Sequence, residues 1–417
     1  MTENLDFYKD EVFRCMRCGL CLPSCPVYSE EKIESMGPRG RLSLIESYVS
    51  RKFKLSKIYK DRIKKCLECK SCFFECPSGI KIDEIIHLSK EDIFYNEGFR
   101  IFPNILKSII KKRSTLSLSF EMLKILNIPN RVFHNKIDPN RFFYNFLILN
   151  PLEPKKGFPT KDKRSSSKEN KKIFKAKKSQ GKVIFYRGCL INYIYKDIEK
   201  ASIDVLNRLG FDVVLVKDEI CCGAPLYSYG DRKGFKEIAE INIKLFKLYD
   251  EAPVISSCPT CTVTLKNYYK ELFPDNKLSP SVWDINEFIM KYPDIDFRGF
   301  SEEKRITYHD PCHLKRSLGI HKEPRLFLKS IPNANFIEMK DSDRCCGFAG
   351  LFSFFYHDLA RKIALKKLDN IKDSKADTVI TSCPGCMMHI QRTLIRENSP
   401  IEVKHIVEIL REANIYV

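Results

Sequence analysis

The sequence predicts an α/β protein with an all-α N-terminal part, followed by two related α/β units. Three observations lead to this fold class. Helical periodicity surrounds the first cysteines, short β-branched runs alternate with helical patterns after residue 183, and the second half of the chain repeats itself. We therefore divide the 417 residues into four parts, 1–100, 101–182, 183–300 and 301–417.

The first part, residues 1–100, contains two dense cysteine runs. They are RCMRCGLCLPSCP from residue 14 and CLECKSCFFECP from residue 66. The residues between the runs, and the segment IKIDEIIHLSKEDIFYNEGF after them, have the apolar spacing of helices. We expect a helical domain rather than a compact one that contains β-strands.

Both runs have the spacing C-x2-C-x2-C-x3-C-P, which is typical of bacterial ferredoxins with two [4Fe-4S] clusters. Two-residue gaps allow three thiolates to surround one cubane, whereas the fourth cysteine points away and reaches the other cluster. This predicts one cluster on Cys15, Cys18, Cys21 and Cys76, and a second on Cys66, Cys69, Cys72 and Cys25.

Disulfide bonds and zinc sites, the two other common uses of clustered cysteines, fit this sequence less well. The first residues, MTENLDFYKDEVF, lack the apolar core of a secretory signal, so we expect a reducing cytoplasmic compartment, which disfavours disulfides. Zinc sites commonly use two separated cysteine pairs, and a third C-x2-C step followed by proline, present twice, favours iron–sulfur clusters.

Residues 101–182 are expected to form a basic, aromatic connector and linker without cysteines. The stretch from 161 to 182 carries ten Lys or Arg against one Asp and one Glu, which favours a solvated linker, with contact to anionic lipid as the alternative. Segment 101–160 is a candidate for peripheral membrane contact, although no apolar run is long enough to span a bilayer. The net charge of +19 comes without a nucleic-acid motif, so no nucleic-acid partner is predicted.

The second half of the chain contains an internal repeat of about 124 residues. VIFYRGCL at 183 matches ITYHDPCHL at 306, VVLVKDEICCGAP at 213 matches FIEMKDSDRCCGFAG at 336, and VISSCPTC at 254 matches VITSCPGC at 379. β-Branched runs such as KVIFY precede helical patterns such as DIEKASIDVLNRLG, which predicts a parallel sheet in each repeat. The cysteines follow the strands, so they should converge at the carboxyl edges of the sheets.

Each repeat contributes five cysteines, including an adjacent pair followed by glycine. We expect Gly223 and Gly347 to allow close backbone approach, and Pro259 and Pro384 to stiffen the C-x2-C loops. A thioredoxin-like C-x2-C is the alternative, but it does not require the other three cysteines. The ten candidate catalytic residues are Cys189, Cys221, Cys222, Cys258, Cys261, Cys312, Cys345, Cys346, Cys383 and Cys386.

This combination of motifs resembles the cysteine-rich CCG domain family over about 320 of the 417 residues. The family includes the B-type and D-type components of heterodisulfide reductase and the iron–sulfur subunits of glycolate oxidase, lactate-utilisation enzymes and anaerobic glycerol-3-phosphate dehydrogenase. A two-cluster ferredoxin fused to two repeats is similar to the D-type component of heterodisulfide reductase and to the glycolate oxidase iron–sulfur subunit. The resemblance implies that complete five-cysteine sets bind one or two further non-cubane [4Fe-4S] clusters that cleave a disulfide.

The leading functional expectation is an iron–sulfur oxidoreductase that passes electrons between the cubanes and the CCG site and reduces a disulfide. The alternative is a non-catalytic electron-transfer subunit of an FAD-linked glycolate, lactate or glycerol-3-phosphate dehydrogenase. Since the chain lacks a G-x-G-x-x-G signature, a flavin would belong to a partner protein. The partner is expected to be a flavoprotein or a membrane cytochrome or quinone-linked subunit. We expect a cytoplasmic location, with peripheral contact at the inner membrane face as a further possibility.

Several histidines and arginines lie beside the cysteine motifs. His309, His313 and His389 are either proton donors to a departing thiolate or histidines that cap helices and hydrogen-bond nearby. Arg39 and Arg41 either have a functional role, in holding an anionic partner or in tuning the potential of a cubane, or form ordinary surface pairs. Both interpretations stay open for each group at this point.

Overall fold

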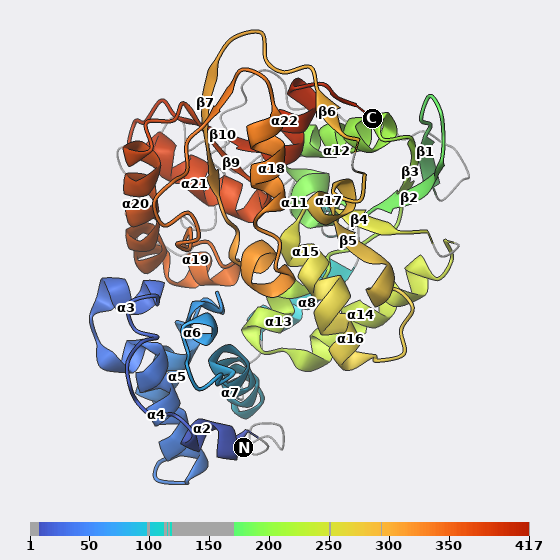
Figure 1. Ribbon diagram of the computed structural model, residues 1–417. Coiled ribbons are helices and arrows are strands. Elements are labelled where there is room, and N and C mark those ends of the chain that lie inside the picture. Colours follow the sequence, from blue (N-terminus) through green and yellow to red (C-terminus); the bar gives the residue numbers. More distant parts are fainter. Residues whose placement is uncertain are drawn as a thin grey trace.

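The computed structural model describes residues 8–97, 101–111, 115, 117–118, 171–249, 252–292 and 294–416. A helical N-terminal part packs below two α/β lobes, at the lower left of Figure 1. Its helices are α2 (Lys9–Phe13), α3 (Pro26–Glu31), α4 (Pro38–Val49), α5 (Lys57–Lys64), α6 (Ser71–Phe74) and α7 (Ile82–Asn96).

The N-terminal helices surround a separate apolar core. Proline stands in the first turn of α3 and α4, where its missing N–H costs no hydrogen bond. Ser56 caps α5, because its hydroxyl accepts a hydrogen bond from the Tyr59 amide (3.1 Å). Ile45, Ile63 and Ile86 are fully buried between α4, α5 and α7. Residues 8–97 contain no strand, which agrees with the helical domain expected from the sequence.

The first α/β lobe is built on a five-stranded sheet of order β1-β3-β2-β4-β5. Strands β2 to β5 are parallel, and β1 is antiparallel to β3 at one edge. The strands are β1 (Lys171–Phe174), β2 (Gly181–Phe185), β3 (Phe211–Val216), β4 (Val254–Ser256) and β5 (Val282–Asp284).

The second lobe repeats this topology in a four-stranded parallel sheet of order β10-β9-β7-β8. Read from the opposite edge, its order β8-β7-β9-β10 matches β3-β2-β4-β5, so the three cysteine landmarks occupy equivalent strand ends. The strands are β7 (Lys304–His309), β8 (Ala334–Phe336), β9 (Thr378–Thr381) and β10 (Glu402–His405). This matching order is what the internal repeat predicts.

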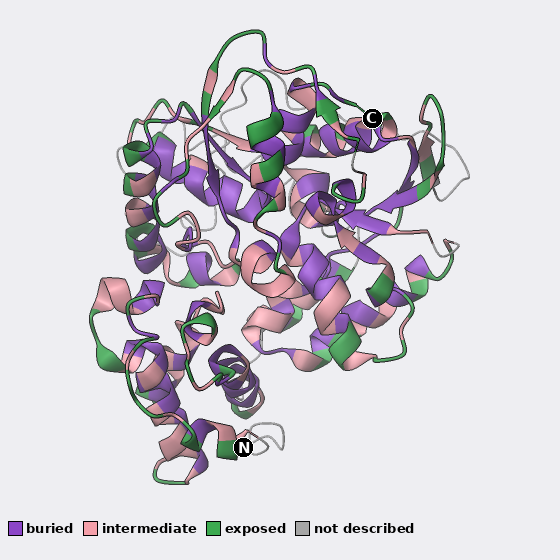
Figure 2. Ribbon diagram, viewed as in Figure 1, coloured by how far each residue is buried: buried purple, intermediate pink, exposed green. Residues whose placement is uncertain are grey.

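Helices cover both sheets, and strands such as β3, β4 and β9 are buried, whereas β8 and β10 are partly exposed (Figure 2). A single apolar core extends through the two lobes and includes Val183 and Ile184 of β2 together with Ile306 of β7 and Ile380 of β9. The principal helices are α11 (Gly188–Tyr193), α12 (Lys196–Arg208), α13 (Ala224–Tyr229), α14 (Arg232–Phe246), α15 (Pro259–Val263), α16 (Tyr269–Leu272), α17 (Ile285–Ile289), α18 (Glu323–Ser330), α19 (Leu351–Phe355), α20 (His357–Asp373), α21 (Pro384–Arg396) and α22 (Ile406–Glu412). The segment that connects the two lobes contains a short strand, β6 (Asp296–Phe297). It pairs antiparallel with β11 (Ile415–Tyr416), near the end of the described chain.

The segment expected to be a linker ends earlier than the sequence analysis placed it. Residues 171–174, with the sequence KKIF, form the edge strand β1 and pair with 213–216 of β3. Lysine is common on edge strands because its charge discourages further strand pairing, so a Lys-rich composition does not exclude a strand. Residues 119–170 of the connector lie outside the described residues, and the domain boundaries proposed at 100, 182 and 300 stay predictions.

Helix α8 (Ile101–Lys111) belongs to the segment considered for membrane contact. Its apolar side packs on the first lobe, where Ile110 is buried, and Lys107 and Lys111 both pair with Glu237 (3.3 and 3.2 Å). Within the described ranges, no helix combines the length and apolarity needed to span a bilayer.

The N-terminal part is held against both lobes. The ring of His87 on α7 stacks on Tyr227 of α13 at a centroid distance of 3.9 Å, and Tyr227 stacks in turn on Tyr268 at 4.0 Å. On the other side, Lys366 of α20 forms an ion pair with Glu30 of α3 (2.8 Å). These contacts fix the two cysteine runs relative to the cysteines of the lobes.

Candidate metal centres

Four cysteines of the N-terminal part line one pocket. It receives three cysteines of the first run and the last cysteine of the second run, namely Cys15, Cys18, Cys21 and Cys76. Cys18 is exposed, so this group reaches the protein surface. Arg39 also lines the pocket, where its Nη1 donates to the Arg17 carbonyl (2.8 Å) and its Nε pairs with Glu34 (2.6 Å).

The second group combines Cys66, Cys69 and Cys72 with Cys25. Burial raises the pKa of the Cys72 thiol well above its usual value, and the nearby Cys66 and Cys69 raise it further. Arg41 is 1% exposed and donates to the Arg62 and Lys65 carbonyls (2.7 and 3.1 Å), so it is not a surface residue. Its charge partly offsets the effect of burial, which raises the pKa of Cys25.

The structure thus places Cys76 with the first run and Cys25 with the second run. This is the exchange of fourth cysteines that the C-x2-C-x2-C-x3-C-P spacing predicts, and their role as ligands stays a prediction. All 18 cysteines are free thiols, with no disulfide among them. Buried thiols suit a bound metal, because the metal supplies the positive charge that a thiolate lacks in an apolar site.

The ten cysteines of the lobes lie after the strands, as expected from the sequence. Cys258 and Cys383 are the N-cap residues of α15 and α21, and the proline of each C-x2-C motif opens the helix. Gly223 and Gly347 both have φ of +87°, a conformation that favours glycine. Gly223 packs closely against α14 and Gly347 against α20, so the backbone beside each cysteine pair is held tightly.

The thiols of the two lobes form one connected group. Cys222 accepts hydrogen bonds from Cys221 and Cys261, and these bonds lower its pKa. In the second lobe, bonds from Cys345 and Cys386 lower the pKa of Cys346 in the same way.

The two sets meet where Cys383 accepts a hydrogen bond from Cys258. This bond and a second one from Cys386 lower the pKa of Cys383. Each thiolate-prone sulfur is therefore surrounded by further thiols, which is a donor set suited to iron. Sequence spacing predicted convergence within each repeat and on shared clefts, but not which cysteines would join the repeats.

The second lobe also reaches the N-terminal part. Burial raises the pKa of Cys312 to about 12, and Cys69 of the second group is near enough to contribute to this rise. Arg316 lies between them: its Nη1 is 3.4 Å from the Cys69 carbonyl and its Nη2 is 3.1 Å from Asp343. Sequence analysis missed Arg316, although its position four residues after Cys312 is the spacing of one helical turn.

The three histidines considered from the sequence differ in their surroundings. His309 is 1% exposed, and its Nδ1 is 3.1 Å from the Ser342 carbonyl. His313 Nδ1 is 3.0 Å from the Thr260 hydroxyl, which connects it to the first lobe. His389 Nε2 is 3.4 Å from the Ala360 carbonyl, in keeping with a structural hydrogen bond.

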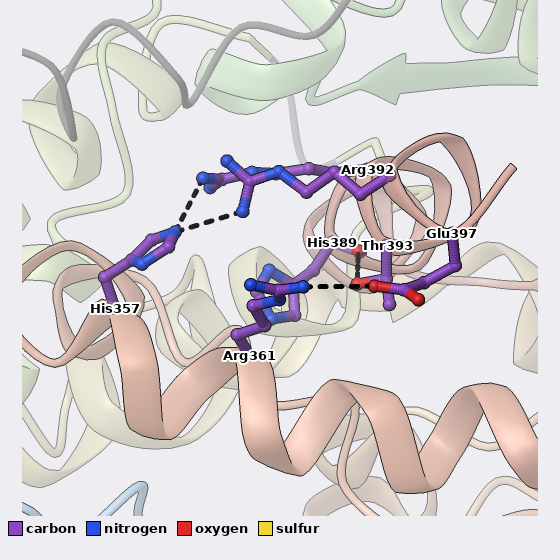
Figure 3. A pocket seen from close by; sticks show the side chains of 7 residues that line it. His357, Arg361, His389, Arg392, Thr393 and Glu397 are labelled. Carbon is purple, nitrogen blue, oxygen red and sulfur yellow. Dashed lines mark hydrogen bonds and ion pairs between the residues drawn. The ribbon is translucent and has the colours of Figure 1, made fainter. Parts of the chain in front are cut away.

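A basic pocket that is lined in part by His389 lies between α20 and α21 (Figure 3). Its cations contact each other or nearby acids: Arg392 and Arg396 reach His357 Nε2 (2.8 and 3.3 Å), and Arg361 pairs with Glu397 (3.2 Å). Burial, followed by the charge of Arg392, lowers the pKa of His357. No cysteine lines this pocket, so it is separate from the thiol groups.

The fold and the thiol groups define a class of protein in which a two-centre ferredoxin-type domain precedes two cysteine-rich α/β repeats. Family models agree with this description. The 4Fe-4S dicluster domain matches residues 11–80, and the cysteine-rich CCG domain matches 183–266 and 306–391.

Known iron–sulfur proteins are similar to this chain over nearly its whole length. The probable glycolate oxidase iron–sulfur subunit of Bacillus subtilis is 28% identical over 97% of this chain and 94% of its own length. An uncharacterized iron–sulfur protein of Methanocaldococcus jannaschii is 30% identical over 96% of this chain and 73% of its own length. A crystal structure of a hypothetical protein from Helicobacter pylori shares the fold, with a TM-score of 0.58 at 10% identity over 99% of this chain and 73% of that one.

The chain belongs to the family of iron–sulfur proteins that carry CCG cysteine-rich domains. Its N-terminal domain is a 4Fe-4S dicluster domain, and its role is electron transfer in an oxidoreductase.

Proposed function

We propose that the protein is the electron-transfer subunit of an oxidoreductase complex. Electrons pass from a partner flavoprotein to the first N-terminal cluster, then to the second cluster, and then to the clusters of the CCG lobes. The observation that carries this proposal is the contact of Arg316, four residues after Cys312, with the Cys69 carbonyl (3.4 Å), which brings the second cysteine group of the dicluster domain to the second lobe. The N-terminal cysteine runs hold two [4Fe-4S] clusters, and the two five-cysteine sets hold non-cubane clusters.

A surface suited to the partner surrounds the first cluster site. Cys18 is exposed there, and Met16 and Leu20 beside it are 79% and 57% exposed. Large exposed apolar side chains grouped together are typical of interaction sites. Because the chain has no dinucleotide fingerprint and resembles a glycolate oxidase iron–sulfur subunit, the partner is a flavoprotein that oxidises a 2-hydroxy acid.

The partner surface can be tested with one substitution and a matched control. Met16→Glu places a charge beside the first cluster site, whereas Ile58→Glu places the same charge at an apolar residue of α5 that is 66% exposed. We expect Met16→Glu to slow reduction of the clusters by the reduced flavoprotein about tenfold or more, with unchanged iron content. Ile58→Glu should behave as the wild type, and equal rates for both variants would contradict the proposal.

Disulfide reduction at the CCG lobes is the second candidate function. It is favoured by the complete set of ten cysteines, eight of which are buried, and by the junction of the two sets at Cys258 and Cys383. In this reaction two electrons and two protons cleave one disulfide into two thiols. Single-turnover mixing of the reduced protein with a small disulfide measures it directly: two thiols released per two electrons support reductase activity, and clusters that stay reduced exclude it.

A further inference from the structure

His309 lies at the end of β7 with its imidazole buried beside the cysteines of the second lobe. Its Nδ1 is 3.1 Å from the Ser342 carbonyl, which can only accept a hydrogen bond. Nδ1 therefore carries the proton, and Nε2 keeps its lone pair. Nε2 is buried and makes no hydrogen bond to nitrogen or oxygen within the described part of the chain.

This nitrogen faces two sulfurs. The donor atoms of His309, Cys346 and Cys386 all lie within 4.8 Å of one another, and all three residues are buried. Ligands around one metal ion, at about 2.0–2.3 Å from it, lie about 3.5–4 Å apart. The three side chains are therefore close to the positions required for binding the same ion.

The carbonyl that orients His309 is itself firmly held. Lys367 Nζ donates to the same Ser342 oxygen (3.1 Å), and the Ser342 hydroxyl donates to Asp310 (2.8 Å). Arg325 pairs with Asp310 (2.7 Å) and completes this buried support. A histidine that binds a metal through one nitrogen commonly donates its other N–H to a carbonyl in this way.

We propose that Nε2 of His309 binds an iron of the second CCG centre together with Cys346 and Cys386. The inference rests on the proposed function, because it requires the second lobe to bind a cluster. It adds to the ten cysteines a nitrogen ligand that the five-cysteine pattern does not contain.

The described part of the first lobe contains no such histidine beside its cysteines. Tyr186 is the residue equivalent to His309, at the same distance before the first cysteine of its repeat, and it lies near Cys222 and Cys261. Its hydroxyl donates a hydrogen bond to the Ile220 carbonyl (2.7 Å), so the hydroxyl has a structural role. The two CCG centres therefore differ chemically despite their shared topology.

This difference should give the centres unequal reduction potentials. The imidazole adds a neutral donor to one centre only, and the identity of the ligands is one of the factors that set the potential of an iron–sulfur cluster. The centre of the second lobe, which lies next to the dicluster domain, should therefore have a reduction potential distinct from that of the centre of the first lobe.

Pulsed EPR of the anaerobic full-length protein tests the ligand. The signal of the second lobe is identified by its loss in Cys386→Ser, and iron content is measured in parallel. We expect a strong nitrogen coupling on this signal that changes from the 14N to the 15N pattern when histidine is isotopically labelled. The coupling should disappear in His309→Phe, together with a shift of the potential of this signal, and both should be unchanged in His389→Phe.

The outcomes separate the ligand from the proposed function. A second-lobe signal without strong nitrogen coupling, or with coupling unchanged in His309→Phe, overturns the histidine ligand and leaves the cluster in place. Iron content and signals that account for cubanes alone overturn both. If His309→Phe does not fold, the labelled wild-type protein still decides the question, because the isotope effect requires no substitution.

Discussion

Arg316 of the second CCG repeat contacts Cys69 of the dicluster domain, with its Nη1 3.4 Å from the Cys69 carbonyl oxygen. The side chain is 9% exposed and pairs with Asp343 (3.1 Å). One buried cation therefore stands between the second N-terminal cysteine group and Cys312. A positive charge in this position favours the reduced, more negative state of any cluster on either side.

Replacing Arg316 by Gln should lower the reduction potentials of the neighbouring clusters and slow electron transfer between the two domains. The cause is the loss of positive charge from a site of low dielectric constant, where charges interact strongly. Redox titration followed by EPR measures the potentials. Arg305→Gln is the control, because Arg305 is exposed and pairs only at the surface with Asp377; a shift of equal size in both variants would rule out a local effect of Arg316.

Cys258 and Cys383 join the two lobes, so loss of Cys258 should affect both CCG centres. We expect Cys258→Ser to remove more iron per chain than Cys189→Ser, since Cys189 contacts the thiol of Cys221 within its own lobe. Iron and acid-labile sulfide analysis of the two purified variants provides the comparison. Equal iron losses would show that the lobes bind their metal independently.

The two equivalent glycines should respond differently to alanine. A Cβ at Gly223 would lie 2.9 Å from the Phe235 ring, whereas one at Gly347 would lie 2.6 Å from the Ala360 carbonyl oxygen. Both variants are strained at φ of +87°, by about 1–3 kcal/mol, but only the phenyl ring can move aside. Gly347→Ala should therefore lower the free energy of unfolding more than Gly223→Ala in urea denaturation, and the reverse order would refute this packing argument.

His87 should make stability depend on pH. It lies between Glu68 and Glu91 (3.5 and 3.4 Å), and despite burial, which acts in the opposite direction, these carboxylates raise its pKa to about 9. A histidine with a raised folded-state pKa stabilises the protein fully below its unfolded value near 6.5. This contribution is lost as the pH rises through about 9.

The contribution of His87 amounts to about 3 kcal/mol at most. Urea unfolding of the anaerobic protein between pH 6 and 10 should show a decline in stability for the wild type. His87→Gln should be less stable at low pH and should lack most of this decline. A variant with the same decline as the wild type would assign the pH dependence to other groups.

Much of this architecture was predictable from local sequence signals. The cysteine spacing with proline predicted the dicluster domain, and the landmarks at offsets near 124 predicted two equivalent lobes, because local backbone geometry and strand–helix periodicity determine both. The exchange of Cys25 and Cys76 followed from the same spacing. Strand β1 was missed because two of its four residues are lysines and its partner strand lies about 40 residues away in the sequence.

The contacts between domains were not predictable in the same way. The proximity of Cys69 to Cys312 and of Cys258 to Cys383 depends on how segments far apart in the sequence pack against each other, and no periodicity encodes that packing. The burial of Arg41 was not predictable from the sequence either. An arginine in a GPRGRL segment suggests a surface position, yet Arg41 is buried, and a backbone carbonyl accepts a hydrogen bond from its guanidinium group.

The most direct test of the account is the iron and sulfide content of the anaerobically purified full-length protein, combined with EPR of the reduced and oxidised states. Two cubanes and two CCG clusters require about sixteen irons per chain, together with a paramagnetic signal that disappears when CCG cysteines are replaced. We predict this result. A value of about eight irons, with signals of reduced cubanes alone, would contradict the central claim that the CCG lobes hold clusters.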